Sequence, residues 1–147
     1  MTQAPPATPV PFARAMRIIH GCLVASMALA GGVFALLVQG QGRSFGVPRN
    51  VGIVLAGVAV SLLVVASTML RRKVPERRFD QSQDDYWASP DTRGTSVLLW
   101  AVADGAGLAG LVGYLLTGGA VPAAAAVLSI LALIAFRPAS LEREGGA

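Results

Sequence analysis

Cysteine and histidine are nearly absent from this sequence, which has one residue of each among 147. A single Cys cannot form a disulfide within the chain, so a disulfide-stapled secreted domain is excluded. A single His excludes bis-histidine haem ligation and a His-rich metal site within one protomer. The sequence also lacks a CxxC pair and a Gly-rich phosphate loop followed by Lys. We therefore expect no enzymatic activity, no cofactor and no bound metal.

Charged residues are also scarce, at 14% of the chain against 54% hydrophobic residues. A soluble domain carries about 25% charged residues, so a soluble enzyme is excluded. The apolar residues gather in four blocks, most of them close to the roughly 20 residues that cross a bilayer core of about 30 Å. These blocks are residues 18–39, 51–70, 97–116 and 121–136. They are continuous and lack the alternation of barrel strands, so we expect helices.

The pattern predicts an all-α membrane protein with four transmembrane helices in two tandem helical hairpins. The first 11 or so residues are rich in proline and carry no charge, which is typical of a disordered lead-in. The expected segments are a lead-in at 1–13, a transmembrane hairpin at 14–73, a cytoplasmic polar loop at 74–94, a second hairpin at 95–137 and a cytoplasmic tail at 138–147.

Basic residues predict the orientation. All but two of the 12 Lys and Arg residues flank the blocks on the side that holds both termini. That set is Arg14, Arg17, Arg71, Arg72, Lys73, Arg77, Arg78, Arg93, Arg137 and Arg143, against Arg43 and Arg49 on the other side. Basic residues favour the cytoplasmic side, so both termini should be cytoplasmic in a multi-pass protein of a cell inner membrane. The net charge of +4 is therefore a topology signal, and we expect no nucleic-acid partner.

Three consecutive residues of this basic set directly follow the second block. Arg71, Arg72 and Lys73 could contact anionic lipid headgroups, each at about 1 kcal/mol, or act as a stop-transfer signal alone. In the polar segment that follows, Tyr86 and Trp87 suit an aromatic anchor at the membrane interface.

An internal repeat supports the two-hairpin arrangement. Residues 32–40 align with residues 110–118, with Gly at both ends of each segment and apolar residues between them. In this register Ser26 occupies the position of Asp104. The alignment indicates either a duplicated hairpin or a chance match between apolar helices.

Asp104 is the only acidic residue inside an apolar block. An ionised carboxylate in the membrane costs at least about 2.5–3.5 kcal/mol, so such residues pair, lose their charge or face water. Asp104 is therefore a candidate for proton or cation binding, with Ser26 and His20 as weaker candidates. The competing interpretation is a structural hydrogen bond to a neighbouring helix or subunit. His20 alone is more typical of a residue that bonds a backbone carbonyl or lipid near the membrane surface.

Small residues surround Asp104 on most sides of its helix. Rows of small residues let membrane helices approach closely, so this helix should have neighbours on more than one face. The row predicted to pack is Ala101, Gly105, Ala109 and Gly113, with Gly107 and Gly110 in further small pairs. Four helices leave part of such a surface unused, which favours a homo-oligomer or contact with other membrane subunits.

The segment from Asp104 to Val112 resembles the carboxylate helix of the ATP synthase c subunit, or proteolipid, family. In both, an intramembrane acid is followed six residues later by Gly-Leu-Val, which here is residues 110–112. The resemblance implies that Asp104 matches the ion-carrying acid and that Ser26 marks a copy that has lost it. In that family, however, the acid lies on the second helix of its hairpin, whereas here it lies on the first.

Three functions follow as hypotheses. The first is an accessory or assembly subunit of a larger membrane complex. The second is a protomer that is similar to the c subunit and moves protons or cations through Asp104. The third is a membrane anchor whose middle loop recruits a cytoplasmic partner. In each case the lipid bilayer is a partner of the chain.

Overall fold

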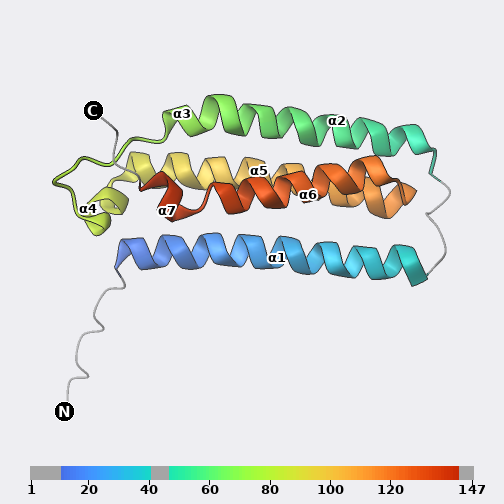
Figure 1. The fold of residues 1–147 in the computed structure, drawn as a ribbon, viewed down its shortest axis with the longest axis horizontal. Helices are drawn as coiled ribbons and strands as arrows, with labels where there is room; N and C mark the ends of the chain where they lie inside the picture. The colour runs from blue at the N-terminus through green and yellow to red at the C-terminus, as the bar shows by residue number, and fades with distance from the viewer. Residues whose placement is uncertain (1–10, 41–46, 143–147) are drawn as a thin grey trace, which may run out of the picture.

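A computed structural model describes residues 11–40 and 47–142, and within these ranges every regular element is a helix (Figure 1). The elements are α1 (Phe12–Gly40), α2 (Arg49–Val65), η1 (Ala66–Leu70), α3 (Arg71–Lys73), α4 (Gln83–Ala88), α5 (Pro90–Thr117), α6 (Ala120–Ala135) and α7 (Pro138–Leu141). Because η1 is one π-helical turn with helical residues on either side, α2, η1 and α3 form a single continuous helix. The all-helical class is confirmed.

Three of these helices are long and apolar enough to cross a membrane. They are Phe12–Gly40 with 29 residues, Arg49–Lys73 with 25 and Pro90–Thr117 with 28. At 1.5 Å per residue the 16 residues of α6 extend about 24 Å, which is shorter than a bilayer core of about 30 Å. The chain is therefore a helical membrane protein by the length and composition of three helices, with α6 as a shorter apolar helix.

The expected segment boundaries shift where polar residues are helical. Within the lead-in expected at 1–13, Phe12 and Ala13 already belong to α1, while residues 1–10 lie outside the described residues. The polar segment at 74–94 contains α4, and α5 begins at Pro90, since proline is well tolerated in the first turn of a helix. The tail expected at 138–147 contains α7, and its residues 143–147 lie outside the described part.

The α5–α6 pair lies at the centre of the bundle. Gly118 ends α5 with a φ of 62°, a left-handed conformation that glycine adopts without strain, and its N–H donates to Tyr114 O at 2.7 Å. This turn lets α6 begin at Ala120 and run antiparallel along α5. A Cβ at Gly110 would lie 2.7 Å from Ala126 N, so the two backbones approach as closely as glycine allows.

The first hairpin is arranged around the α5–α6 pair. Figure 1 shows α1 and α2 on opposite sides of the α5–α6 pair. Both helices pack against α5, but among the described residues α1 and α2 do not form a packed pair with each other. The two helices of the first hairpin are therefore consecutive in sequence but pack separately against α5, and a tandem-hairpin arrangement across the membrane stays a prediction. The physical reason for the separate packing is that small residues on several sides of α5 accept α1 and α2 separately.

The small residues of α5 have unequal environments. Gly107 and Gly110 are buried, and a Cβ at Gly107 would lie 2.7 Å from Met27 Cε of α1. In the predicted row, Ala109 is half-buried and Gly113 is buried. A Cβ added at Gly113 would lie 2.9 Å from Pro122 Cβ. The two members nearest the start of α5 are free of such contacts: Ala101 is exposed, and a Cβ at Gly105 would meet nothing within 4 Å. The row is thus divided between the interior and an uncovered surface.

One end of the bundle is covered by α4 and α7, and we call it the capped end (Figure 1). Its core contains Trp87 and Trp100, each 0% exposed, and Tyr86, which is 1% exposed. The interpretation of Tyr86 and Trp87 as an interfacial anchor is therefore wrong. Both rings are buried because α4 folds back against α1 and the beginning of α5.

Candidate functional site

Asp104 lies midway along α5 and is half-buried. Across the described ranges 11–40 and 47–142, no hydrogen bond or ion pair involves its carboxylate, and the salt bridge found there joins Arg17 to Glu142. Within the described residues, Asp104 thus has no hydrogen bond to a hydroxyl on a neighbouring helix, and a bond to another subunit stays a prediction.

Asp104 borders a side of α5 that the other helices leave uncovered. At 100° per residue, Ala101, Asp104, Gly105, Leu108 and Val112 share one side of the helix, which we call the outer face of α5. Leu108 is 46% exposed and Val112 39% exposed, whereas α1, α2 and α6 pack on the remaining sides. The most central helix of the bundle therefore presents an acid, a glycine and an alanine at its surface.

The two weaker candidates are not bonded to Asp104. Ser26 is exposed and its Oγ donates to Leu23 O in the same helix at 2.9 Å. The Nε2 atom of His20 lies 2.9 Å from Leu133 O, and an Nε2–H tautomer donates to that carbonyl. The His20 ring also meets Trp100 edge-on, with 5.0 Å between ring centroids. The interpretation of His20 as a residue that bonds a backbone carbonyl is confirmed.

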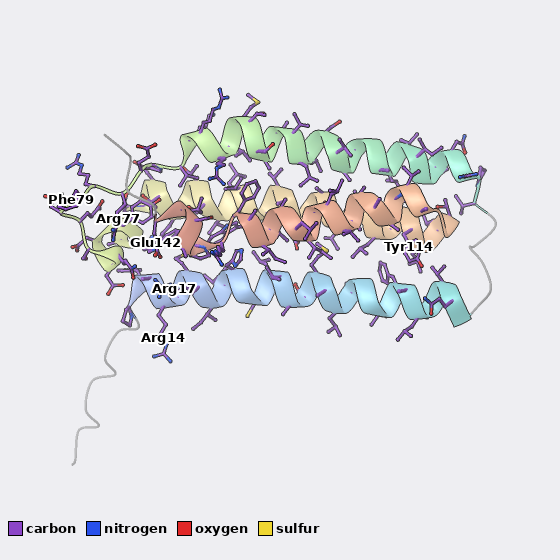
Figure 2. The ribbon with its side chains drawn as sticks, viewed as in Figure 1. Arg14, Arg17, Arg77, Phe79, Tyr114 and Glu142 are labelled. Carbon is purple, nitrogen blue, oxygen red and sulfur yellow. The ribbon has the colours of Figure 1, made fainter. Side chains whose placement is uncertain are left out.

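A cluster of hydrogen-bonded polar residues connects the elements of the capped end (Figure 2). The carboxylate of Glu142 is only 7% exposed and accepts from Trp87 Nε1 at 2.8 Å and from Arg17 Nη2 at 3.2 Å. Arg17 also donates to Gln83 Oε1 at 2.9 Å, and the Ala13 N–H donates to Asp84 Oδ1 at 3.0 Å. These bonds join α1, α4 and the residue after α7, so they close the end of the bundle.

Tyr86 completes this cluster from α4. Its hydroxyl donates to Pro75 O at 2.8 Å, and Leu141 O lies 3.2 Å away as a second acceptor. Burial, with a smaller effect of the Glu142 charge, raises the pKa of Tyr86 from 10.0 to about 12. The phenol is therefore neutral, and its role is to join the segment after α3 to α7.

The basic residues that end the second long helix lie at the capped end. Arg71, Arg72 and Lys73 are exposed, and the Arg71 guanidinium lies 5.7 Å from the centroid of the Phe136 ring. Phe79 projects from the tip of this end and is 89% exposed (Figure 2). Contact with lipid headgroups stays a prediction for Arg71, Arg72 and Lys73. Among the described residues no three His, Cys, Asp or Glu side chains are grouped to hold a metal ion.

Sequence patterns did not reveal the capped-end cluster. Arg17 and Glu142 are separated by 125 residues and Trp87 and Glu142 by 55, so no local spacing links them. The available signal was the adjacent aromatic pair Tyr86 and Trp87 in a mostly polar segment that also contains Phe79. Adjacent aromatic residues occur both in anchors at the membrane interface and in buried contacts at the end of a bundle, so the sequence did not distinguish the two.

The repeat also meets unequal surroundings. Gly110 is buried against α6, whereas its counterpart Gly32 is exposed, with nothing within 4 Å of an added Cβ. Asp104 is half-buried and its counterpart Ser26 is exposed. A duplicated origin stays a prediction, because helices of common origin can occupy different environments.

Comparison with models of protein families, with curated proteins and with solved structures gives no match for this chain. The resemblance to the c subunit therefore stays a prediction that rests on residues 104–112 and their counterparts in α1.

Proposed function

We propose that this chain is a multi-pass subunit of a larger membrane complex in a bacterial-type cell inner membrane. In this proposal α1, the continuous helix from α2 to α3, α5 and α6 all cross the membrane, and both termini lie in the cytoplasm. The concentration of Lys and Arg near the capped end supports this orientation. A short span such as α6 is accommodated by local thinning of the bilayer or by association with other subunits.

The single observation that carries the proposal is the half-buried Asp104, which borders the uncovered outer face of α5 and has no partner within the described residues. Facing lipid, an ionised carboxylate at this depth costs at least about 2.5–3.5 kcal/mol. A partner helix that covers the face and bonds Asp104 removes this cost. Gly105 and Ala101 leave room for such a helix, since small residues permit close approach between membrane helices.

Co-purification from membranes in a mild detergent tests the proposal. The tagged wild-type chain is compared with Gly105→Leu, which places a large side chain on the outer face at a position where an added Cβ meets nothing within 4 Å. The control is Gly32→Leu, because an added Cβ at Gly32 also meets nothing within 4 Å, but Gly32 is an exposed residue of α1 and not part of the outer face of α5. We expect the wild type and Gly32→Leu to retain bound subunits and Gly105→Leu to lose them.

Two results would contradict the proposal. One is a wild-type chain that is recovered with lipid and detergent alone under conditions that preserve other membrane complexes. The other is an equal recovery of subunits with Gly105→Leu and Gly32→Leu, since the outer face would then not be the contact surface.

A second candidate function is proton or cation movement through Asp104 in a homo-oligomer. It is favoured by the absence of a partner for this carboxylate within the described residues, because an ion-exchanging acid must be free to change its protonation state. Proton uptake into proteoliposomes distinguishes the two. Transport predicts uptake that Asp104→Asn abolishes, whereas a contact residue predicts background uptake for both chains.

The third hypothesis, a membrane anchor with a recruiting loop, has less support. The polar segment folds into α4, and its two largest aromatic side chains, Tyr86 and Trp87, are buried in the capped end. A recruiting surface would have to use the remaining exposed residues, of which Phe79 is the most prominent.

A further inference from the structure

The chemistry of Asp104 limits which kind of helix can cover the outer face of α5. An ionised carboxylate accepts hydrogen bonds and pairs with positive charge, so Asp104 keeps its charge in the membrane only where the covering helix supplies a donor or a basic side chain at the same depth. This inference rests on the proposed function, because it assumes that the outer face is covered.

A second copy of this chain brings no positive charge to that depth. The apolar blocks 18–39, 51–70 and 97–116 and the whole of α6 contain no Lys or Arg. Copies in one membrane share an orientation, so the basic residues at the capped end and Arg49 at the opposite end stay near the surfaces. A two-fold dimer through the outer face would place one Asp104 against another, which disfavours the charged form of both.

The exposed hydroxyl donors of the apolar segments are already in use within one copy, and the half-buried Tyr114 lies ten residues from Asp104 along α5, about 15 Å away in depth. The exposed hydroxyls of the apolar segments are Ser26, Ser61, Ser67 and Thr68, and each donates to a carbonyl of its own helix. The acceptors are Leu23 O, Gly57 O and, for the last two, Val64 O. The thiol of Cys22 is exposed but is a weak donor. A copy of this chain is therefore poorly suited to satisfy Asp104.

We propose that the outer face of α5 binds a transmembrane helix of a different protein, and that this helix carries a Lys or Arg that pairs with Asp104. Ala101, which is exposed, and Gly105, which has open space around an added Cβ, flank the carboxylate on the same face. Their small side chains leave space beside Asp104 for the long stem of a basic residue, whose apolar carbons pack on the helix while the charge reaches the acid. Charge complementarity thus selects the partner, and the small residues set how closely it packs.

Photo-crosslinking in intact membranes tests this inference. A photoreactive amino acid replaces Leu108, which is 46% exposed on the outer face, or, as a control, Leu131 on α6, which is 54% exposed. We expect the Leu108 position to form an adduct with one other protein and the Leu131 position to form none with that protein. The adduct must map to a transmembrane helix that has a Lys or Arg at the depth of Asp104.

Charge variants give the second readout. Asp104→Asn keeps the shape and removes the charge, so the adduct should fall at least about ten-fold, as expected when one member of a buried charge pair is lost. Asp104→Glu should retain most of it. Neutralising the partner's basic residue together with Asp104→Asn should restore more adduct than either change alone, because neither group is then left as an unpaired charge. The thermal unfolding of isolated Asp104→Asn checks that the chain still folds.

Three outcomes would overturn the inference, and they are distinguishable. An adduct between two copies of this chain leaves the proposed membrane assembly standing but refutes the foreign basic helix. So does a foreign helix that has no basic residue, or an adduct that Asp104→Asn leaves unchanged. No protein adduct at Leu108 at all refutes both the inference and the proposed function.

Discussion

Glu142 and Arg17 form one ion pair but have very different surroundings. The side chain of Glu142 is 6% exposed and that of Arg17 is 51% exposed. A charge pair with one solvated member contributes about 0–1 kcal/mol, whereas a buried N–H left without its acceptor costs about 1–3 kcal/mol. The bond from Trp87 Nε1 to Glu142 should therefore matter more than the ion pair.

We predict that Glu142→Ala lowers the free energy of unfolding by about 1–3 kcal/mol and Arg17→Ala by at most about 1 kcal/mol. Unfolding of the purified chain in detergent, followed by tryptophan fluorescence, measures both. Glu142→Gln serves as the matched control, since its amide oxygen still accepts from Trp87. Equal losses for Arg17→Ala and Glu142→Ala would show that the ion pair, and not the tryptophan bond, holds the capped end.

Tyr86 makes the capped end sensitive to high pH. Its pKa is raised by burial and by Glu142 to about 12 in the folded chain, from 10.0 in an unfolded one. The neutral phenol is therefore favoured by folding: its contribution to stability is complete below pH 10 and is lost as the pH rises toward 12. Deprotonation also removes the donor to Pro75 O.

We expect the melting temperature to fall between pH 10 and 12, and Tyr86→Phe to flatten this fall while lowering stability at neutral pH. The chain has one other tyrosine, Tyr114, so Tyr114→Phe is the matched control and should keep the alkaline fall. A pH profile that Tyr86→Phe does not alter would assign the alkaline loss to another group.

At the scale of helices, two glycines of α5 should respond to alanine with opposite signs. Alanine stabilises an open helix position by roughly 0.5–1 kcal/mol relative to glycine. Gly105 is such a position, because nothing lies within 4 Å of an added Cβ. At Gly110 the same methyl group would lie 2.7 Å from Ala126 N, so α5 and α6 must separate, and overpacking typically costs about 1–3 kcal/mol.

We therefore predict that Gly105→Ala leaves the isolated chain as stable or more stable, and that Gly110→Ala destabilises it. Thermal unfolding in one detergent compares the two directly. If Gly105→Ala destabilises the isolated chain as much as Gly110→Ala does, the outer face is covered within the chain and cannot be the contact surface proposed for a partner.

The helices themselves could be predicted from sequence because continuous apolar blocks leave few other structures in a membrane. Their neighbours could not. Small residues recur all around α5, so the pattern indicated close contacts without showing that Gly110 meets α6 while Gly105 meets nothing. For the same reason the sequence did not show that α1 and α2, which are consecutive in the chain, pack separately against α5.

Asp104 was recognisable as a candidate from its position alone, since it is the only acid in an apolar block. The sequence could not show that Asp104 lacks a partner within the described residues. Ser26 and His20 were both possible partners in sequence, but in the structure each bonds a backbone carbonyl instead. The contacts of Glu142 were also hidden, since they depend on the fold of α4 and α7 at the capped end.

At the scale of the whole molecule, the chain's single native cysteine makes orientation measurable. In a Cys22→Ser background, Phe79→Cys places a thiol at the tip of the capped end, where the native side chain is 89% exposed. Arg49→Cys places one at the opposite end, at an exposed position at the start of α2. The excess of basic residues near the capped end predicts that this end is cytoplasmic.

We expect a membrane-impermeant maleimide to label Arg49→Cys in intact cells and Phe79→Cys only after permeabilisation. A lipid-soluble maleimide, which should label both, controls for reactivity. Labelling of Phe79→Cys in intact cells would reverse the orientation, and labelling of both positions from outside would mean that the segment between them does not cross the membrane.

The central claim is that this bundle is one subunit of a larger membrane assembly, and the mass of the intact particle tests it most directly. The chain weighs 15.1 kDa. Particles are excised from the native membrane with a disc-forming polymer and measured by native mass spectrometry. We expect the wild-type particle to exceed the mass of one chain by at least one further protein subunit. We expect the Gly105→Leu particle to contain a single chain with lipid. A wild-type particle of one 15.1 kDa chain with lipid alone would contradict the account.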